Sequence, residues 1–115
     1  MACMSFLKPF EITVIERLTA EVLAPELLAV VLRDGEFIEY DYTGYGYYLT
    51  FGHPLLSAER IVCNEQWVLG NLGDVEASFI VFLESRELML ECYPLGGDPP
   101  IPPDFRDQQV MLQVI

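Results

Sequence analysis

One histidine and three cysteines are the residues in this sequence best suited to chemistry: His53, Cys3, Cys63 and Cys92. An imidazole next to a thiol can create a reactive thiolate, so His53 with Cys63 or Cys92 is a candidate pair. Their spacing is not diagnostic, because such pairs are assembled only in the folded protein. The odd number of cysteines and the lack of a CxxC spacing argue against a disulfide framework and a zinc site. We therefore expect free thiols in a reducing, cytoplasmic setting, and we assign no catalytic residue.

The segment GNLGD, from Gly70 to Asp74, contains the GxxG spacing with which some domains grip a nucleic-acid backbone. No lysine or arginine flanks this loop and Asp74 ends it, so it would repel phosphate. Acidic residues are plentiful elsewhere, but they alternate along expected strands and form no EF-hand or histidine cluster. The sequence thus indicates neither a metal site nor a cofactor.

Five of the six tyrosines lie within residues 40–48, in the segment YDYTGYGYYLTFGHP, which predicts a hairpin. A two-residue loop at Thr43-Gly44 pairs Tyr42 with Tyr45 and Tyr40 with Tyr47, all on one face. A three-residue loop with Gly44 in the left-handed conformation would change that register. This face is a core, a partner surface or a small-ligand pocket, and His53 before Pro54 is typical of a strand end. The candidate binding residues are Tyr40, Tyr42, Tyr45, Tyr47 and His53.

A second hairpin is predicted in ASFIVFLESRELMLECY, with Ser85-Arg86 as its loop. This loop pairs Leu83 with Leu88 and continues along an unbroken apolar face through Phe79 and Cys92. The opposite face is mixed rather than polar, which predicts that a helix or another subunit covers it. We therefore expect a homodimer, with these interface residues: Ile80, Phe82, Met89 and Tyr93.

Other segments position these hairpins. Residues 1–24 fit either a helix or a strand, because branched residues come early and helix formers late. Residues 25–34 predict a nearly all-buried helix, with Pro25 at its first position and Gly35 just after its end. The alternative is a strand with a turn at Asp34-Gly35. Residues 60–69 predict one strand that ends in a glycine-rich turn. Residues 94–107 predict a rigid proline-rich crossover, and residues 108–115 predict a final edge strand.

Composition limits the classes of partner. The 115 residues suit one domain, and 52% are hydrophobic, which is enough for a core. The amino-terminal segment MACMSFLKPF lacks the long apolar run of a secretory signal. The longest apolar run, residues 27–32, is far below the ~20 residues that span a bilayer. The net charge of −12 disfavours nucleic acid and anionic membrane and favours a basic partner.

Four stretches, YTGYGYYLTFGHP, VLGNLGD, SFIVFLESRELMLECY and PPDFRDQQV, together resemble small acidic bacterial proteins carried on mobile gene cassettes and in accessory gene clusters. The resemblance covers about residues 25–110. It implies a bacterial, cytoplasmic protein with an accessory role. It carries over no catalytic residue.

We expect a single α+β domain over residues 1–115, in which one main helix packs on a strongly bent antiparallel sheet of about five or six strands. A sheet that curls far enough to close would be barrel-like. The expected function is non-enzymatic protein binding, immunity-like or adaptor-like, to a basic partner through an acidic, tyrosine-rich surface. One alternative is a small-ligand-binding protein or small enzyme with a pocket in the curved sheet, using Tyr42, Tyr47, His53 and Cys63 or Asp74. Another is a homodimer whose aromatic face is its own interface.

Overall fold

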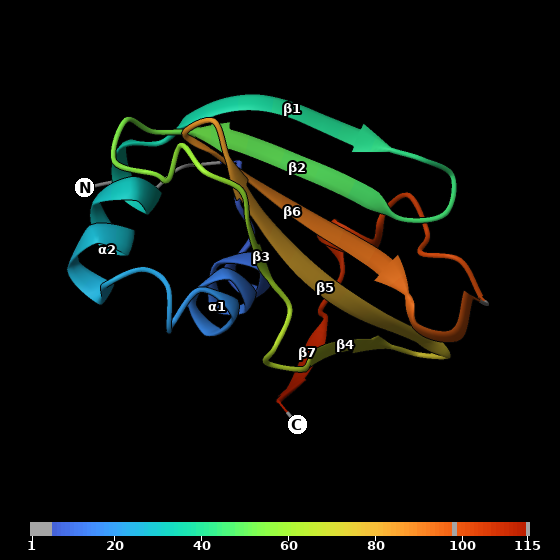
Figure 1. Cartoon of the computed structure of the whole chain (residues 1–115). Helices are drawn as coiled ribbons and strands as arrows, with labels where there is room; N and C mark the ends of the chain where they lie inside the picture. The colour runs from blue at the N-terminus through green and yellow to red at the C-terminus, as the bar shows by residue number, and fades with distance from the viewer. Residues whose placement is uncertain (1–5, 98, 115) are drawn as a thin grey trace.

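The computed structural model describes residues 6–97 and 99–114, and it has an α+β architecture. In these residues two helices accompany seven strands that form one antiparallel sheet, in the order β1-β2-β6-β5-β4-β7, with β3 also on β5 (Figure 1). The α+β class is confirmed. The expectation of one main helix is one helix short, and that of five or six strands is one or two strands short. The sheet is open rather than barrel-like, because β1 and β7 do not pair.

Both helices begin at a proline, which suits the first helical position because its missing N–H has no intrahelical partner there. Helix α1 covers Pro9–Leu18, so the ambiguous amino-terminal region forms a helix over this stretch and no strand in the residues that the structure describes. Helix α2 covers Pro25–Asp34, as predicted. The expectation that α2 is nearly all buried is wrong. Only one of its faces is buried, through Leu28, Val31 and Leu32, which recur at helical spacing. Neither helix in the described residues has the length and apolar character needed to cross a bilayer.

The strands follow in chain order, with two single-turn 3-10 helices near the carboxyl end. Their bounds are β1 Glu36–Tyr42, β2 Tyr47–Gly52, β3 Ile61–Cys63, β4 Val68–Leu72, β5 Val75–Glu84, β6 Glu87–Pro94, η1 Leu95–Gly97, η2 Phe105–Asp107 and β7 Met111–Val114. Strand β7 lies at the edge of the sheet beside β4, as expected for the final strand.

The β5–β6 hairpin has the predicted register. Leu83 pairs with Leu88, and the pairing continues without a break to Phe79 and Cys92. Ser85 and Arg86 form the turn with φ of 56° and 63°. Two left-handed residues match the twist of the strands that they join, which explains the regular pairing.

The β1–β2 register differs from the prediction by two residues. Tyr42 pairs with Tyr47 rather than with Tyr45, and Tyr45 lies in the turn. Thr43 causes the shift, because its hydroxyl oxygen accepts hydrogen bonds from the N–H groups of Tyr45 and Gly46 at 3.3 and 3.1 Å. A shift of two residues keeps Tyr40, Tyr42 and Tyr47 on their predicted face, since side chains alternate with a period of two. The bulge between Phe37 and Glu39 breaks this alternation, so Phe37 lies opposite the buried Phe51 on the core side.

The segment predicted as one strand over residues 60–69 is two strands that lie in tandem along β5. Ile61 of β3 pairs with Leu83, whereas Leu69 of β4 pairs with Ser78. The polar residues 64–66 separate them, and Trp67, predicted to share a strand face, is 54% exposed. A run of polar side chains cannot continue the buried face, so the chain leaves the ladder there.

The core lies between the sheet and the helices, which cover one face of the sheet (Figure 1). Every second residue along β2, β5 and β6 points into this core and is buried. Fully buried examples are Leu49, Phe51, Val81, Leu83, Leu88 and Leu90. The alternate residues form the opposite face, which we call the outer face. Its central residues are half-buried: Tyr48, Thr50, Ile80, Phe82, Met89 and Glu91.

Candidate functional site

The tyrosines predicted to bind a partner make contacts within the chain. Tyr47 is 1% exposed, so it cannot belong to a partner surface in this conformation. The Tyr42 hydroxyl donates to the carbonyl of Ile101 at 2.6 Å, and the Tyr45 hydroxyl donates to the carbonyl of Gly97. Tyr40 packs against Tyr47 with ring centroids 5.5 Å apart. The aromatic face of the first hairpin is therefore the core side of the sheet.

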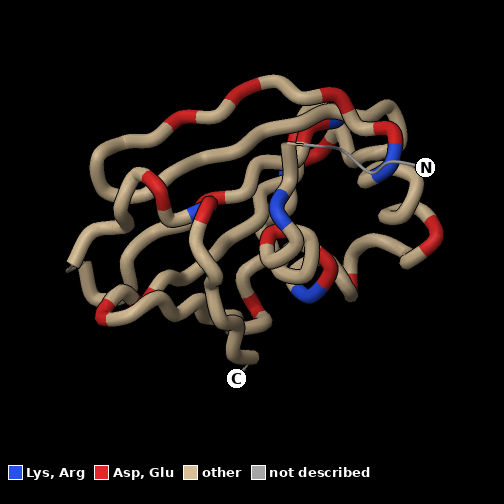
Figure 2. Tube along the Cα trace, turned by 180° about the vertical axis from the view of Figure 1, so that it is seen from behind, with Lys and Arg blue, Asp and Glu red and all other residues tan. Residues whose placement is uncertain are grey.

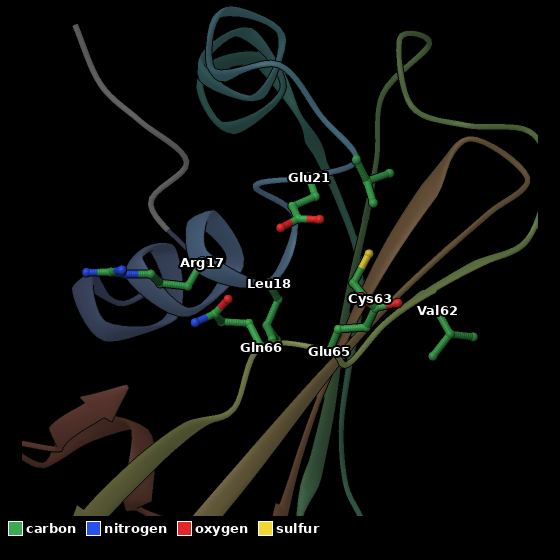
Figure 3. Close-up of a pocket in the computed structure, with 8 residues that line it drawn as sticks. Arg17, Leu18, Glu21, Val62, Cys63, Glu65 and Gln66 are labelled. Atoms are coloured by element: carbon green, nitrogen blue, oxygen red, sulfur yellow. The ribbon is translucent and has the colours of Figure 1, made fainter. Parts of the chain in front are cut away.

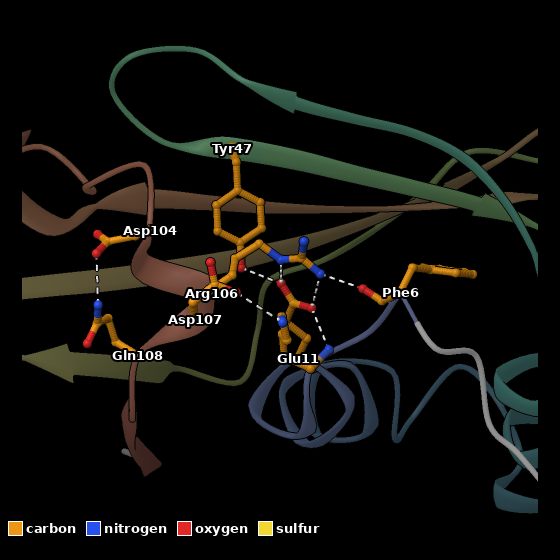
Figure 4. A network of polar contacts seen from close by, with 8 residues as sticks. Phe6, Glu11, Tyr47, Asp104, Arg106, Asp107 and Gln108 are labelled. Carbon is orange, nitrogen blue, oxygen red and sulfur yellow. Dashed lines mark hydrogen bonds and ion pairs between the residues drawn. The ribbon is translucent and has the colours of Figure 1, made fainter.

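A buried ion pair lies beneath these tyrosines (Figure 4). Arg106 donates from Nε to Oε2 of Glu11 at 2.6 Å and from Nη2 to Oε1 at 2.9 Å. The Tyr47 hydroxyl donates to the same Oε2 at 2.6 Å, and the backbone N–H of Lys8 donates to Oε1 at 2.8 Å. Both carboxylate oxygens are thus satisfied by the fold, and the cluster joins α1, β2 and η2.

Arg106 also stacks on aromatic rings. Its guanidinium carbon lies 5.1 Å from the ring centroid of Tyr40 and 5.7 Å from that of Tyr47. Burial of Tyr40 raises the pKa of its phenol, so the phenol stays neutral under the cation at ordinary pH. Sequence reasoning missed this pair, since Glu11 and Arg106 are far apart in the chain. The available signal was an acidic residue in the apolar stretch PFEITVI, next to a helix start.

His53 and the cysteines are not brought together. His53 follows β2, where its Nδ1 accepts a hydrogen bond from the N–H of Leu55 at 3.0 Å. It lines an open hollow with Asp34 and Arg86. Cys63 lines a different groove, and Cys92 is fully buried in β6. The candidate pair of a histidine with a thiol is therefore not assembled, and His53 marks the end of its strand as its proline suggested.

The groove beside Cys63 has a volume of about 400 Å³ and lies between the end of α1 and strand β3 (Figure 3). Arg17, Glu21, Glu65 and Gln66 contribute its polar lining. Burial, and then the charge of Glu65, raise the pKa of the Cys63 thiol. Burial likewise raises the pKa of the Cys92 thiol. A thiol with a raised pKa is a poor nucleophile at neutral pH, so this chemistry favours a structural role. Cys3 lies outside the described residues.

The remaining polar candidates do not form a site with these groups. Asp74, from the GNLGD segment, is exposed in the turn between β4 and β5. Within residues 6–97 and 99–114, no three histidine, cysteine or acidic side chains gather closely enough to hold a metal ion. In the same residues every buried side-chain nitrogen or oxygen has a hydrogen-bond partner, so these groups are already committed to the fold.

The outer face carries apolar side chains in cross-strand rows. Phe82 pairs with Met89 across β5 and β6, and Met89 pairs with Thr50 of β2. Val62 of β3 continues the row on the far side of Phe82 and is 40% exposed. The predicted interface residues Ile80, Phe82, Met89 and Tyr93 all lie on this face and are half-buried. In the part of the chain that the structure describes, no helix or strand layer packs over them, since both helices pack on the other face (Figure 1).

Two shallow hollows indent the outer face. Trp67, Ile80 and Tyr93 line one of about 140 Å³. Glu39, Asp41, Tyr48, Thr50 and Met89 line the other, which is open and has a volume of about 380 Å³. Neither is an enclosed ligand cavity. Side chains of a partner could fit into these two hollows.

Carboxylates flank this apolar strip on two sides, and Glu91 lies within it opposite Ile80. Glu91 lies beside Tyr48, whose hydroxyl donates to its Oε2 at 3.2 Å. The charge of Glu91 raises the pKa of the Tyr48 phenol. The register places Asp41 beside Tyr48 and Glu39 beside Thr50, while Glu84 and Glu87 pair at the hairpin end. Arg60 lies over the Phe82 ring at 5.4 Å and contacts Glu84 at 3.1 Å, so its positive charge is already paired with a carboxylate of the same chain.

Comparison with known proteins identified no relative. No family model matches the chain, and neither a curated protein nor a solved structure is significantly similar to it.

Proposed function

We propose that this protein is a non-enzymatic binding protein that engages a basic partner protein through the outer face of its sheet. The observation that carries the proposal is the half-exposed apolar strip of Phe82, Met89 and Ile80, which carboxylates flank on the β1 side and at the hairpin end. Protein interfaces combine a desolvated centre rich in aromatic residues and methionine with a polar rim. This face has both parts.

The binding surface proposed here differs from the one expected from the sequence. The expectation used Tyr40, Tyr42, Tyr45 and Tyr47, whose side chains lie on the core side of the sheet or in the turn. The face with Tyr48 and the second hairpin remains accessible. Its carboxylates would steer a cationic protein into contact and orient it, and this effect weakens with salt.

A basic partner fits this face better than a second copy of the chain. Two outer faces placed together would bring Glu39, Asp41, Glu84, Glu87 and Glu91 of one copy near those of the other. Like charges across an interface oppose association by several kcal/mol, to order of magnitude. Arg60 contacts Phe82 on this face, but Glu84 already pairs with it. The predicted homodimer remains a prediction, and the charge of this face does not favour it.

Within this proposal the protein is immunity-like or adaptor-like: it would occupy a cationic surface of its partner and either block or deliver it. The resemblance to small acidic bacterial accessory proteins suggests a cytoplasmic partner. The small-ligand and enzyme alternatives are less favoured, because Tyr47, His53, Cys63 and Asp74 lie in separate parts of the fold.

Affinity capture with matched variants tests the proposal. The tagged chain and a Phe82→Asp/Met89→Asp variant are used to capture proteins from the native host, and each captured protein is purified for titration. The double variant should lose at least tenfold in affinity for a basic partner, because it places charge in the centre of the interface. A Val22→Asp/Leu55→Asp variant is the control, since both residues are exposed but lie outside the outer face. Equal loss in both variants, or capture of acidic proteins alone, would contradict the proposal.

A further inference from the structure

Strand β1 forms an open edge of the sheet. It pairs with β2 on one side, and the sheet order ends there (Figure 1). An edge strand presents a row of backbone N–H and C=O groups that can pair with another strand. Three acidic residues lie along this edge, Glu36, Glu39 and Asp41. Figure 2 marks the acidic positions of the chain in red along its trace. Within the residues that the structure describes, the edge is therefore both unpaired and negatively charged.

The register identifies which backbone groups face outward. The N–H of Thr43 donates to the carbonyl of Gly46 at 2.9 Å, so these two residues form a hydrogen-bonded pair. Hydrogen-bonded and non-bonded pairs alternate in an antiparallel ladder, so Asp41 and Glu39 bond to β2. The backbone groups of Tyr40 and Tyr42 must then point away from β2. Among the described residues, none is recorded as bonding to them on that side.

The side chains follow the opposite alternation. Glu39 and Asp41 lie on the outer face, in the same cross-strand rows as Thr50 and Tyr48. Tyr40 and Tyr42 lie on the inner face, where Arg106 stacks on Tyr40. A bulge between Phe37 and Glu39 interrupts the ladder, so regular pairing is available from Glu39 to Tyr42.

We propose that the basic partner adds an extended segment as a further antiparallel strand along β1, and this inference rests on the proposed function. Residues of that segment opposite Glu39 and Asp41 would be lysine or arginine, because oppositely charged cross-strand neighbours attract. Residues opposite Tyr40 and Tyr42 would be uncharged and branched or aromatic, since they pack beside those rings and near the Arg106 cation. The recognition pattern is thus a basic residue at every second position.

A second copy of β1 does not fit this edge. Antiparallel pairing of two copies would place carboxylates opposite carboxylates, and like charges directly opposite each other destabilise a sheet. Charged residues and a bulge are common protection for edge strands against self-association. In β1 the carboxylates of Glu39 and Asp41 disfavour a second copy but would attract a strand that carries positive charges. Added strands of this kind gain affinity from main-chain hydrogen bonds and specificity from alternate side chains.

Hydrogen exchange measured by NMR tests this inference. The probe is an acetylated and amidated peptide of alternating lysine and valine, titrated to millimolar concentration. In the free protein the amides of Tyr40 and Tyr42 should exchange rapidly, whereas those of Glu39 and Asp41 are protected by β2. Added peptide should slow exchange at Tyr40 and Tyr42 at least tenfold. A Glu39→Lys/Asp41→Lys variant should bind the peptide at least tenfold more weakly.

Two methylated peptides provide matched controls. The valines lie opposite Tyr40 and Tyr42, so methylation of their backbone nitrogens should abolish binding, while methylation of the lysine nitrogens should be tolerated. Equal effects of the two methylations would overturn strand addition, and so would an absence of binding. Binding that shifts resonances of Phe82 and Met89 but leaves Tyr40 and Tyr42 unprotected would also overturn it. That last result would leave the proposed outer-face function standing.

Discussion

Glu11 and Arg106 form a bidentate ion pair that is closed off from solvent on the carboxylate side. Glu11 is fully buried, and the two contacts measure 2.6 and 2.9 Å. The pair connects the first turn of α1 to the turn η2, which lies at the other end of the chain. The amino-terminal helix and the carboxyl-terminal crossover are thus fixed to each other and to β2 through Tyr47.

Removal of one member of this pair should strongly destabilise the protein. In an Arg106→Met variant the Glu11 carboxylate loses two hydrogen bonds and remains buried, which costs about 3–5 kcal/mol in comparable cases. The free energy of unfolding from urea denaturation measures the effect. A double variant, Glu11→Gln with Arg106→Met, should recover part of it, because no uncompensated charge is left and the amide oxygen can still accept from the Tyr47 hydroxyl. An Arg33→Met variant removes an exposed ion pair with Asp34 and should change stability little. A loss no larger in Arg106→Met than in Arg33→Met would contradict this assignment.

The extent to which the sequence predicts this fold depends on how local the controlling contacts are. The β5–β6 register is predicted to the residue, because Ser85-Arg86 and an alternating apolar face determine it locally. Helix α2 is also predicted from local signals, because Pro25 and Gly35 mark its two ends. The β1–β2 register is wrong by two residues, since it depends on the Thr43 hydroxyl and on the approach of Gly46 to β6. The Glu11–Arg106 pair could not be predicted, because nothing local links two residues at opposite ends of the chain.

The close approach at Gly46 gives a second prediction. A Cβ atom at this position would lie 2.2 Å from the backbone carbonyl oxygen of Cys92, which cannot move without disturbing β6. Gly46→Ala should therefore lower the free energy of unfolding by about 1–3 kcal/mol, as overpacking does. Gly44→Asn is the control: no heavy atom lies within 4 Å of its Cβ position, and asparagine tolerates a positive φ. Thermal and urea unfolding should separate the two variants, and equal stability would show that the turn relaxes freely.

Alkaline pH should destabilise the protein through groups that the fold keeps protonated. Burial, and then the charge of Glu11, raise the pKa of both the Tyr47 phenol and the Cys92 thiol. In the unfolded chain the pKa of a tyrosine phenol is about 10 and that of a cysteine thiol is about 8.5. Above about pH 8.5 the folded protein therefore holds more protons than the unfolded chain, and the free energy of unfolding falls as pH rises. The slope reaches about 1.4 kcal/mol per pH unit for each such group.

Urea denaturation across this alkaline range measures the slope. A Cys92→Ala variant is less stable at every pH, because it leaves a cavity in the core. Its stability should nevertheless fall less steeply than that of the parent between about pH 8.5 and 10, because one titrating group is missing. Parallel slopes would show that Cys92 ionises equally in the folded and unfolded chains.

Salt should have opposite effects on the two kinds of binding considered for the outer face. Binding of a basic partner is electrostatically favourable, whereas pairing of two acidic outer faces is electrostatically unfavourable. Binding of a cationic protein is steered by Glu39, Asp41 and Glu91, so its association rate should fall at least tenfold between about 50 and 500 mM NaCl. Self-association through the same face brings like charges together, so screening should strengthen it. Light scattering across the same salt range measures homodimer formation, and stopped-flow mixing measures the association rate of the partner.

A Glu39→Gln/Asp41→Gln variant should weaken the salt dependence of the partner's association rate and increase self-association. Dimerisation that weakens with salt, or that persists in Phe82→Asp/Met89→Asp, would place the dimer interface elsewhere on the molecule.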